Sequence, residues 1–309
     1  MQVVFDCDPG IDDALALAVL TSFVRAGEVD LAAVVATGGN VGLEHTAANV
    51  AFLTQRLALP AATRAGAAEP LGGRSPGDAA AVHGSDGIGG LREGDAAPLP
   101  EPATPAELVG LLAALSPVEP RVLLATGPLT NVATMLEVEP DLARLVDRVV
   151  VMGGAFGDPA GNATPHAEFN IWVDPEAAAV VFAAGLPLTL VPLDVTTKVV
   201  LRPSDADELD VGAGGASLVS RLIRVGSDLY LELLGAAFCE MHDPLAAALL
   251  LRPELVTTTR GAVQVAIGGV ERGRTTFGGD GPPIDVALAV DASTARDVLM
   301  DALAAVPDP

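Results

Sequence analysis

The stretch Asp6-Cys7-Asp8-Pro9-Gly10-Ile11-Asp12-Asp13 places four carboxylates within eight residues and decides how the chain begins to fold. The apolar run Val3–Phe5 before it predicts a buried strand, and its Pro-Gly pair marks a turn. The aliphatic segment Ala14–Leu20 that follows predicts a helix. The carboxylates therefore lie at the C-terminal end of a strand, where open α/β sheets place their ligand crevices.

Four acids this close together repel one another unless a cation lies among them. A hard divalent ion with oxygen ligands, Ca²⁺ or Mg²⁺, suits such a set better than a softer metal. The alternative is that Asp12 and Asp13 only cap the helix and complement its dipole. Capping needs one acid and explains neither Asp6 nor Asp8, so the stretch predicts a metal site.

The composition narrows the function. The net charge of −23 at pH 7 argues against nucleic acid or an anionic membrane as a partner. Two cysteines provide neither a disulfide framework nor zinc spacing. Residues 1–6 lack the basic start of a signal peptide, and glycine and prolines interrupt the longest uncharged stretch, 177–193. We therefore expect a soluble, cytoplasmic protein without a membrane span.

Apolar strand-like runs alternate with helical stretches along most of the 309 residues, which predicts βαβ units and a mostly parallel sheet in one domain, 1–309. Parallel strands would bring the polar motifs that follow them to one edge, where they form one pocket. The segments 66–105 and 204–215 are predicted to be long loops. The predicted strands are 3–5, 31–36, 122–125, 149–152, 188–191, 263–267 and 284–290, and the predicted helices are 12–24, 43–55, 106–115, 129–136, 175–184, 245–251 and 292–304.

A second polar cluster spans residues 162–170 and contains Asn162, Glu168 and Asn170. Amide and carboxylate side chains together offer the donors and acceptors that the hydroxyls of a sugar require. Any one of the three residues could instead cap a loop.

A third cluster, Glu240-Met241-His242-Asp243-Pro244, precedes an aliphatic helical segment. From these residues alone, a helix cap at Asp243 and a buried structural histidine at His242 are as well supported as a functional site.

The chain resembles the inosine–uridine preferring nucleoside hydrolases, whose N-terminal signature residues 6–14 match closely. Further motifs of that family follow in the same order through about residue 250, and the resemblance weakens beyond Leu251. These motifs are Gly39-Asn40, His83-Gly84-Ser85-Asp86-Gly87, Thr126-Gly127-Pro128-Leu129-Thr130-Asn131, Met152-Gly153-Gly154, Ala167-Glu168-Phe169-Asn170, Asp174-Pro175-Glu176-Ala177 and His242-Asp243-Pro244-Leu245-Ala246.

The resemblance implies a single α/β domain with a Rossmann-like central sheet and an active site at the C-terminal ends of the strands. It also implies Ca²⁺-dependent hydrolysis of the N-glycosidic bond of ribonucleosides, through an oxocarbenium-like transition state. Asp8 would be the general base towards a water on the metal, supported by Asp6. The metal would be held by Asp8, Asp13, Asp243 and the backbone carbonyl of Thr126, and the substrate by Asp12, Asn40, Met152, Asn162, Glu168 and Asn170.

The leaving base must gain a proton or otherwise lose electron density. His242, whose ordinary pKa lies near neutrality, is the first candidate acid, and His83, on a glycine-rich loop that could close over the base, is the second. The segment 224–238 offers only Tyr230 and Phe238 as rings, so the contacts to the base remain open. Trp172 lies in an apolar stretch and is predicted to pack in the core.

Two other classes are weighed. A haloacid dehalogenase-like phosphatase also begins with an Asp-x-Asp pair, but it needs a Thr or Val shortly after the second Asp and a later lysine. Residues 9–13 do not supply the Thr or Val, and Lys198 is the only lysine of the chain. A nucleoside- or ribose-binding protein without turnover would keep the ligands but lose the base or acid, and both Asp8 and His242 are present. We therefore expect a small-molecule ribonucleoside as partner and, from the resemblance, a homodimer or homotetramer. The preferred base and the pathway stay open.

Overall fold

The computed structural model describes residues 1–73, 75–92, 94, 97–157 and 161–306. Within them, nine strands form one sheet in the order β10-β13-β7-β6-β5-β1-β2-β3-β4. Two small two-stranded sheets accompany it, β8 with β9 and β11 with β12. The strands are β1 (Gln2–Cys7), β2 (Asp30–Ala36), β3 (Ala62–Ala65), β4 (Glu101–Pro102), β5 (Arg121–Ala125), β6 (Arg148–Met152), β7 (Leu188–Val191), β8 (Val200–Leu201), β9 (Cys239–Glu240), β10 (Val256–Gly261), β11 (Val263–Val265), β12 (Thr275–Phe277) and β13 (Ile284–Val290).

The predicted mostly parallel sheet is confirmed. Every pairing in the nine-stranded sheet is parallel except that of β10 with β13. From β1 the chain builds outwards through β2, β3 and β4, and it then crosses back to place β5 on the other side of β1. This reversal makes the carboxyl ends of β1 and β5 a topological switch point, the usual ligand crevice of such sheets.

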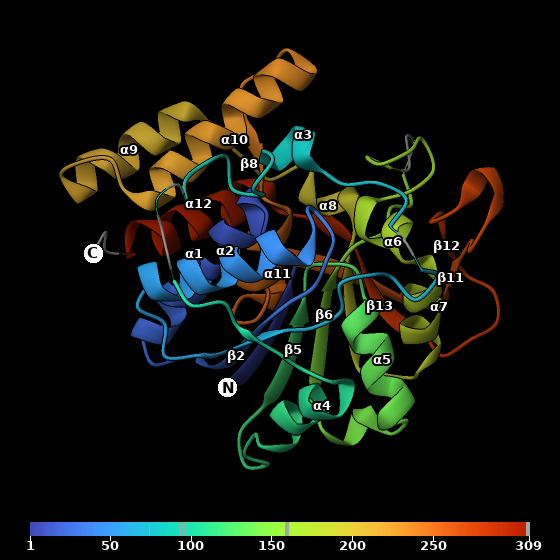
Figure 1. The fold of residues 1–309 in the computed structure, drawn as a ribbon. Coiled ribbons are helices and arrows are strands. Elements are labelled where there is room, and N and C mark those ends of the chain that lie inside the picture. The colour runs from blue at the N-terminus through green and yellow to red at the C-terminus, as the bar shows by residue number, and fades with distance from the viewer. Residues whose placement is uncertain (74, 93, 95–96, 158–160, 307–309) are drawn as a thin grey trace.

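Helices cover both faces of the sheet (Figure 1). Side chains from α1, α2, α11 and α12 pack with Phe5 and Val34 on one face, while those from α4, α5 and α7 pack with Val4 and Val35 on the other. The helices are α1 (Ile11–Arg25), α2 (Leu43–Arg56), α3 (Ala80–His83), α4 (Pro105–Ala113), α5 (Thr130–Val138), α6 (Phe169–Val173), α7 (Pro175–Ala183), α8 (Leu193–Thr196), α9 (Pro203–Ala213), α10 (Leu218–Leu234), α11 (His242–Ala248) and α12 (Ala292–Ala304).

Helix α1 carries the acidic stretch into the interior. Residues Ile11 to Thr21 are all buried, so this helix has no solvent-exposed face over its first three turns. The backbone N–H of Gly10 donates to Oδ2 of Asp13 (2.9 Å), which satisfies one of the free N–H groups at the helix start. A helix enclosed in this way holds Asp13 in a fixed, fully buried position and Asp12 at the helix start, almost entirely buried.

The prediction of a loop at 204–215 is wrong, because the segment forms helix α9. Pro203 occupies the first turn, where its missing N–H costs nothing, and Gly214 ends the helix with φ of 78°. Ala206 and Leu209 are buried against the core, so tertiary packing stabilises this otherwise polar helix. The segment 66–105 is mostly irregular as predicted, interrupted by α3 and β4, and its residues 74, 93 and 95–96 lie outside the described part.

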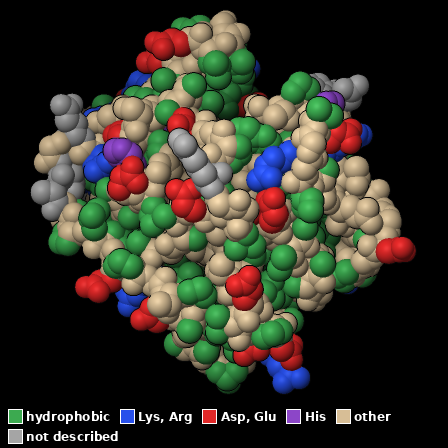
Figure 2. All heavy atoms as spheres, turned by 45° about the vertical axis from the view of Figure 1, so that its right-hand side comes forward, with side chains coloured by type: hydrophobic (Ala, Val, Ile, Leu, Met, Phe, Trp, Pro, Cys, Tyr) green, Lys and Arg blue, Asp and Glu red, His purple; other side chains and the backbone are tan. Residues whose placement is uncertain are grey.

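Figure 2 shows one face of the molecule, on which acidic side chains are scattered among apolar and neutral ones. No helix in the described ranges is long and apolar enough to cross a membrane.

Candidate active site

A cavity of about 410 Å³ opens at the carboxyl ends of the central strands. It is bounded by the start of α1, by the loops after β2, β5 and β6, by helices α3, α6 and α10, and by the segment that leads from β9 into α11. Most of the residues predicted to form the site line it. These are Asp12, Asn40, His83, Thr126, Met152, Asn162, Glu168, Asn170, His242 and Asp243.

Asp6, Asp8 and Asp13 do not line the cavity; all three are buried. Oδ2 of Asp8 accepts the backbone N–H of Asn40 (2.7 Å), while its Oδ1 has no hydrogen-bond partner. A Cβ atom on Gly39 would lie 2.1 Å from Oδ2, and one on Gly127 would lie 2.7 Å from Oδ1. Glycine at both positions thus gives the Asp8 carboxylate its space.

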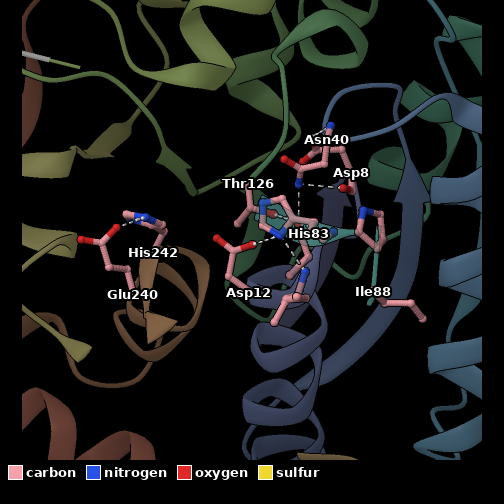
Figure 3. A network of polar contacts seen from close by, with 12 residues as sticks. Asp8, Asp12, Asn40, His83, Ile88, Thr126, Glu240 and His242 are labelled. Carbon is pink, nitrogen blue, oxygen red and sulfur yellow. Dashed lines mark hydrogen bonds and ion pairs between the residues drawn. The ribbon is translucent and has the colours of Figure 1, made fainter. Parts of the chain in front are cut away.

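Asp13 is held by three groups. The hydroxyl of Thr126 donates to Oδ1 (2.7 Å), and the side-chain amide of Asn40 donates to Oδ2 (3.3 Å), beside the N–H of Gly10. Oxygens of Asp12, Asp13 and Asp243 all lie within 4.8 Å of one another. Carboxylates from α1 and α11, which are far apart in sequence, therefore form one cluster. Figure 3 shows Asp12, one of its members.

Burial raises the pKa of Asp8, Asp12, Asp13 and Asp243, and repulsion between the aspartates raises it further at Asp8, Asp13 and Asp243. The pKa of Asp8 and of Asp243 rises well above the usual range, chiefly through burial and then through neighbouring aspartates. The pKa of Asp13 rises to about 6 for the same two reasons. Oδ1 of Asp8 and Oδ1 of Asp12 lack hydrogen-bond partners. Buried anions without counter-charges are unfavourable, so the cluster fits a bound cation.

Asp6 lies beneath this cluster. Burial raises its pKa to about 7, against a hydrogen bond from Asn131 that lowers it. Its Oδ1 also has no partner.

Glu168 and Asn170 border the cavity at the start of α6. The carboxylate of Glu168 accepts backbone N–H groups from Gly154, Asn170 and Ile171. The side-chain amide of Asn170 donates to the carbonyl of Thr126 (2.6 Å). Backbone N–H groups at the start of α6 and at Gly154 therefore hold the carboxylate of Glu168 in place, where it makes the electrostatic potential of the cavity wall more negative.

Asn162 and Met152 also reach the cavity. Oδ1 of Asn162 caps the backbone N–H of Phe169 (2.9 Å), so the loop-cap alternative describes this residue as well. Met152 ends β6, and its sulfur lies 3.6 Å from the amide nitrogen of Asn170.

His83 lies on the short helix α3, over the start of α1 (Figure 3). Its Nδ1 accepts the backbone N–H of Ile11 (3.1 Å) and lies 3.8 Å from Oδ1 of Asp12. Burial lowers its pKa to about 4, so the ring is neutral near pH 7. With Nδ1 accepting, the proton of this neutral ring is on Nε2.

His242 is the first residue of α11, three residues before the predicted start of that helix. Nδ1 lies 2.7 Å from the hydroxyl of Thr196, and Nε2 lies 3.1 Å from Oε2 of Glu240. Burial lowers the pKa of the ring, but the hydrogen bond and charge of Glu240 outweigh it, so the pKa is raised. Both ring nitrogens are therefore engaged.

The prediction of Trp172 as a core residue is wrong. Trp172 is half-buried and lines the cavity, although it follows the apolar pattern of α6. Tyr230, Glu240 and Asp78 line it as well. Glu240 is two residues before His242 in the sequence, and this proximity could have placed it among the predicted site residues. Thr196 is 46 residues from His242, and nothing in the sequence indicated their contact.

The family model for inosine-uridine preferring nucleoside hydrolases matches residues 3–297. The chain belongs to this family. A pyrimidine-specific ribonucleoside hydrolase of Citrobacter koseri is 36% identical over 323 residues, which cover 98% of each chain. Among solved structures, a purine-preferring ribonucleoside hydrolase from Gardnerella vaginalis is 27% identical with a TM-score of 0.90 over 99% of each chain. A plant nucleoside hydrolase is 29% identical with a TM-score of 0.85 over 98% of each chain.

Family membership makes the chain a ribonucleoside hydrolase, an enzyme that acts on N-glycosyl bonds. It confirms the predicted resemblance and fold, and it excludes the phosphatase alternative. The nucleoside hydrolase fold also explains why the cavity lies at the switch point of the sheet.

Proposed function

We propose that this nucleoside hydrolase cleaves ribonucleosides to ribose and free base with Ca²⁺ as its cofactor. The observation that carries the proposal is the buried cluster of Asp8, Asp12, Asp13 and Asp243, with two carboxylate oxygens that have no partner. Such a cluster, beside a cavity that Asn40, Glu168 and Asn170 help to line, suits a hard cation that also contacts sugar hydroxyls.

The donor set fits Ca²⁺. Asp8, Asp13 and Asp243 would supply carboxylate oxygens, and Thr126 would supply its carbonyl, whose second lone pair is free of the Asn170 amide. Asp12 lies close enough to Asp13 and Asp243 to bind the ion or the sugar. Six to eight oxygens are usual for Ca²⁺, which leaves positions for water and substrate. When bound, the ion would supply Lewis acidity that orients a water and lowers its pKa.

Asp8 would act as the general base. Its Oδ2 is occupied by Asn40, so Oδ1 is the atom that would receive the proton of the attacking water. Glycine at positions 39 and 127 leaves the carboxylate the space it occupies, since a Cβ at either position would lie within 3 Å of one of its oxygens.

Asn40, Glu168 and Asn170 would hold the ribose hydroxyls together with Asp12 and Asn162, and Met152 would pack against the ring. The carboxylates among them also stabilise the positive charge that develops on the sugar as the glycosidic bond breaks. His83 offers an Nε2 proton towards the cavity, and His242 offers its ring near the base. We keep His242 as the first candidate for the leaving-group proton.

We propose pyrimidine ribonucleosides as the preferred substrates. The relative of highest identity named above is called pyrimidine-specific, whereas a structural neighbour is called purine-preferring, so the fold itself does not set the preference. Among the described residues, Phe169, Trp172 and Tyr230 are the aromatic side chains that line the cavity and could contact the base.

The testing experiment measures release of reducing sugar from uridine, cytidine, inosine, adenosine and guanosine. It compares the wild type with Asp8→Ala, each before and after exhaustive chelation and after Ca²⁺ is restored. Turnover that both changes abolish, and that Ca²⁺ alone restores, would support the proposal. Binding without turnover would establish a nucleoside-binding protein instead, and turnover that survives chelation would overturn the metal dependence.

We also propose a cytoplasmic homodimer or homotetramer, which rests on the family resemblance alone. Size-exclusion chromatography with light scattering would measure the mass, and a monomer would contradict it.

A further inference from the structure

Glu240 presents one carboxylate oxygen to the cavity without a partner. The hydroxyl of Tyr230 donates to Oε2 (3.1 Å), and Nε2 of His242 lies 3.1 Å from the same atom. Within the described residues, no hydrogen bond to Oε1 is present. The side chain is 19% exposed and belongs to the cavity lining, so Oε1 is accessible to a bound molecule.

The surroundings fix this carboxylate in place. The ring of Tyr230 packs edge-on against Phe238, with centroids 5.0 Å apart, and His242 is held from its other side by Thr196. Figure 3 shows the Glu240–His242 pair apart from the group that contains Asp12, Asp8 and Asn40. Burial favours a protonated Glu240, but the bonds from His242 and Tyr230 outweigh it and lower the pKa. Glu240 is therefore a rigid, ionised acceptor.

Glu240 belongs to a different wall of the cavity from the residues proposed to hold the ribose, which leaves this wall for the base. The residues proposed to hold the ribose occupy the end of the cavity formed by the central strands, whereas Glu240 and Tyr230 belong to the wall formed by β9 and α10, with Leu233 and Leu234. Within the described residues, no lysine or arginine lines the cavity, so no cationic side chain there competes for Oε1. An ionised carboxylate accepts hydrogen bonds and cannot donate one. An exocyclic amino group suits this acceptor, while an oxo group opposite it would face repulsion.

We propose that Glu240 sets base specificity by accepting a hydrogen bond from an exocyclic amino group, so that cytidine is favoured over uridine and adenosine over inosine. The inference rests on the proposed nucleoside hydrolysis and deepens it, because it assigns the feature of the base that the site distinguishes. Tyr230 and His242 orient the carboxylate, and Glu240 makes the contact.

The test compares kcat/KM for cytidine and uridine, and for adenosine and inosine, in the wild type and in Glu240→Gln. The amide of glutamine can donate as well as accept, so we expect the amino-to-oxo ratio to fall roughly tenfold, the effect of one hydrogen bond to a charged group. Loss of the pairing with His242 should slow both members of a pair in a similar way, so the ratio isolates the contact with the base. Glu232→Gln is the matched control, because Glu232 is an exposed carboxylate of α10 that does not line the cavity.

Glu240→Asp provides a second variant that keeps the charge but withdraws it by one methylene, and its ratio should fall as well. The inference would be overturned, with hydrolysis intact, by a wild-type enzyme that prefers the oxo bases. It would equally be overturned by folded variants whose ratio of kcat/KM for amino over oxo bases stays unchanged. Absence of hydrolysis of all four ribosides by the Ca²⁺-loaded wild type would instead refute the proposed function. Thermal melting of each variant separates a change of specificity from a loss of folding.

Discussion

Asn40 makes two hydrogen bonds to Asp8. Its backbone N–H donates to Oδ2 (2.7 Å), and its side-chain amide donates to the backbone carbonyl (3.0 Å). The loop after β2 thereby orients the carboxylate at the end of β1, the neighbouring strand. Because Oδ2 is occupied, the chemistry proposed for Asp8 depends on Oδ1, the oxygen without a partner.

Asp8→Asn should reduce kcat by about 10²–10⁴-fold, the usual contribution of a general base, because an amide cannot accept the proton of water. Release of reducing sugar under saturating nucleoside would measure it. Asp30→Asn is the control, since Asp30 is an exposed acid at the start of β2, and it should retain wild-type activity. An Asp8→Asn enzyme with near wild-type turnover would exclude Asp8 as the base.

Removal of the metal should make stability depend on pH. Burial first, and the other aspartates second, hold the folded-state pKa of Asp13 at about 6, and burial holds that of Asp6 at about 7. Both lie above the value near 4 of an unfolded chain, so the folded state binds these protons more tightly. The stabilisation of the folded state by these two bound protons is complete below about pH 4 and is lost as the pH rises towards 7.

Thermal melting of the chelated protein at a series of pH values would test this expectation. The Tm should fall between pH 5 and pH 7.5, and added Ca²⁺ should raise the Tm more at the higher pH, because the ion replaces the protons. A Tm of the metal-free protein that rises over this range would contradict the prediction.

Gly39→Ala should disrupt the site. The new Cβ would lie 2.1 Å from Oδ2 of Asp8, inside the closest approach of real atoms, so the carboxylate or the loop must move. We expect a loss of activity of at least tenfold, since misplaced catalytic groups are costly. Gly110→Ala, in the exposed part of α4 with no atom within 4 Å of its Cβ, is the control. It should keep full activity and gain up to about 1 kcal/mol of stability.

Local patterns in the sequence were sufficient to predict six strands of the main sheet, β1, β2, β5, β6, β7 and β13, and the acidic residues that follow β1. The short strands β3 and β4 and the edge strand β10 were not predicted, and Asp243 was assigned to the metal site only through the family resemblance. The apolar run 3–5 and the Pro-Gly turn at 9–10 locate the first strand, which in the structure extends through Asp6 to Cys7. Helix α9 was missed because most of its residues are polar and glycines follow at its C-terminal end, and because its few apolar residues are buried only when α10 and α12 pack beside it.

The pairing of His242 with Thr196 and Glu240 could be only partly anticipated. Glu240 is two residues from His242, but Thr196 comes from the end of α8, and only the folded sheet brings the two elements together. Trp172 was predicted to be a core residue because its neighbours in the sequence are apolar, but it lines the cavity. Alternation of residue types predicts which face is buried, but it does not predict which buried face borders a cavity.

Trp172 should report substrate binding. It is the only tryptophan of the chain, it lines the cavity, and its ring lies 6.2 Å from that of Phe169. A nucleoside that enters the cavity should displace water from the indole and change its emission. Titration of cytidine into Ca²⁺-loaded Asp8→Asn, excited at the red edge of tryptophan absorption, should give a saturable change. Trp172→Phe should abolish that signal while calorimetry still detects binding. Calorimetric binding to a variant that keeps Trp172, with no change in its emission, would show that the indole lies outside the occupied part of the cavity.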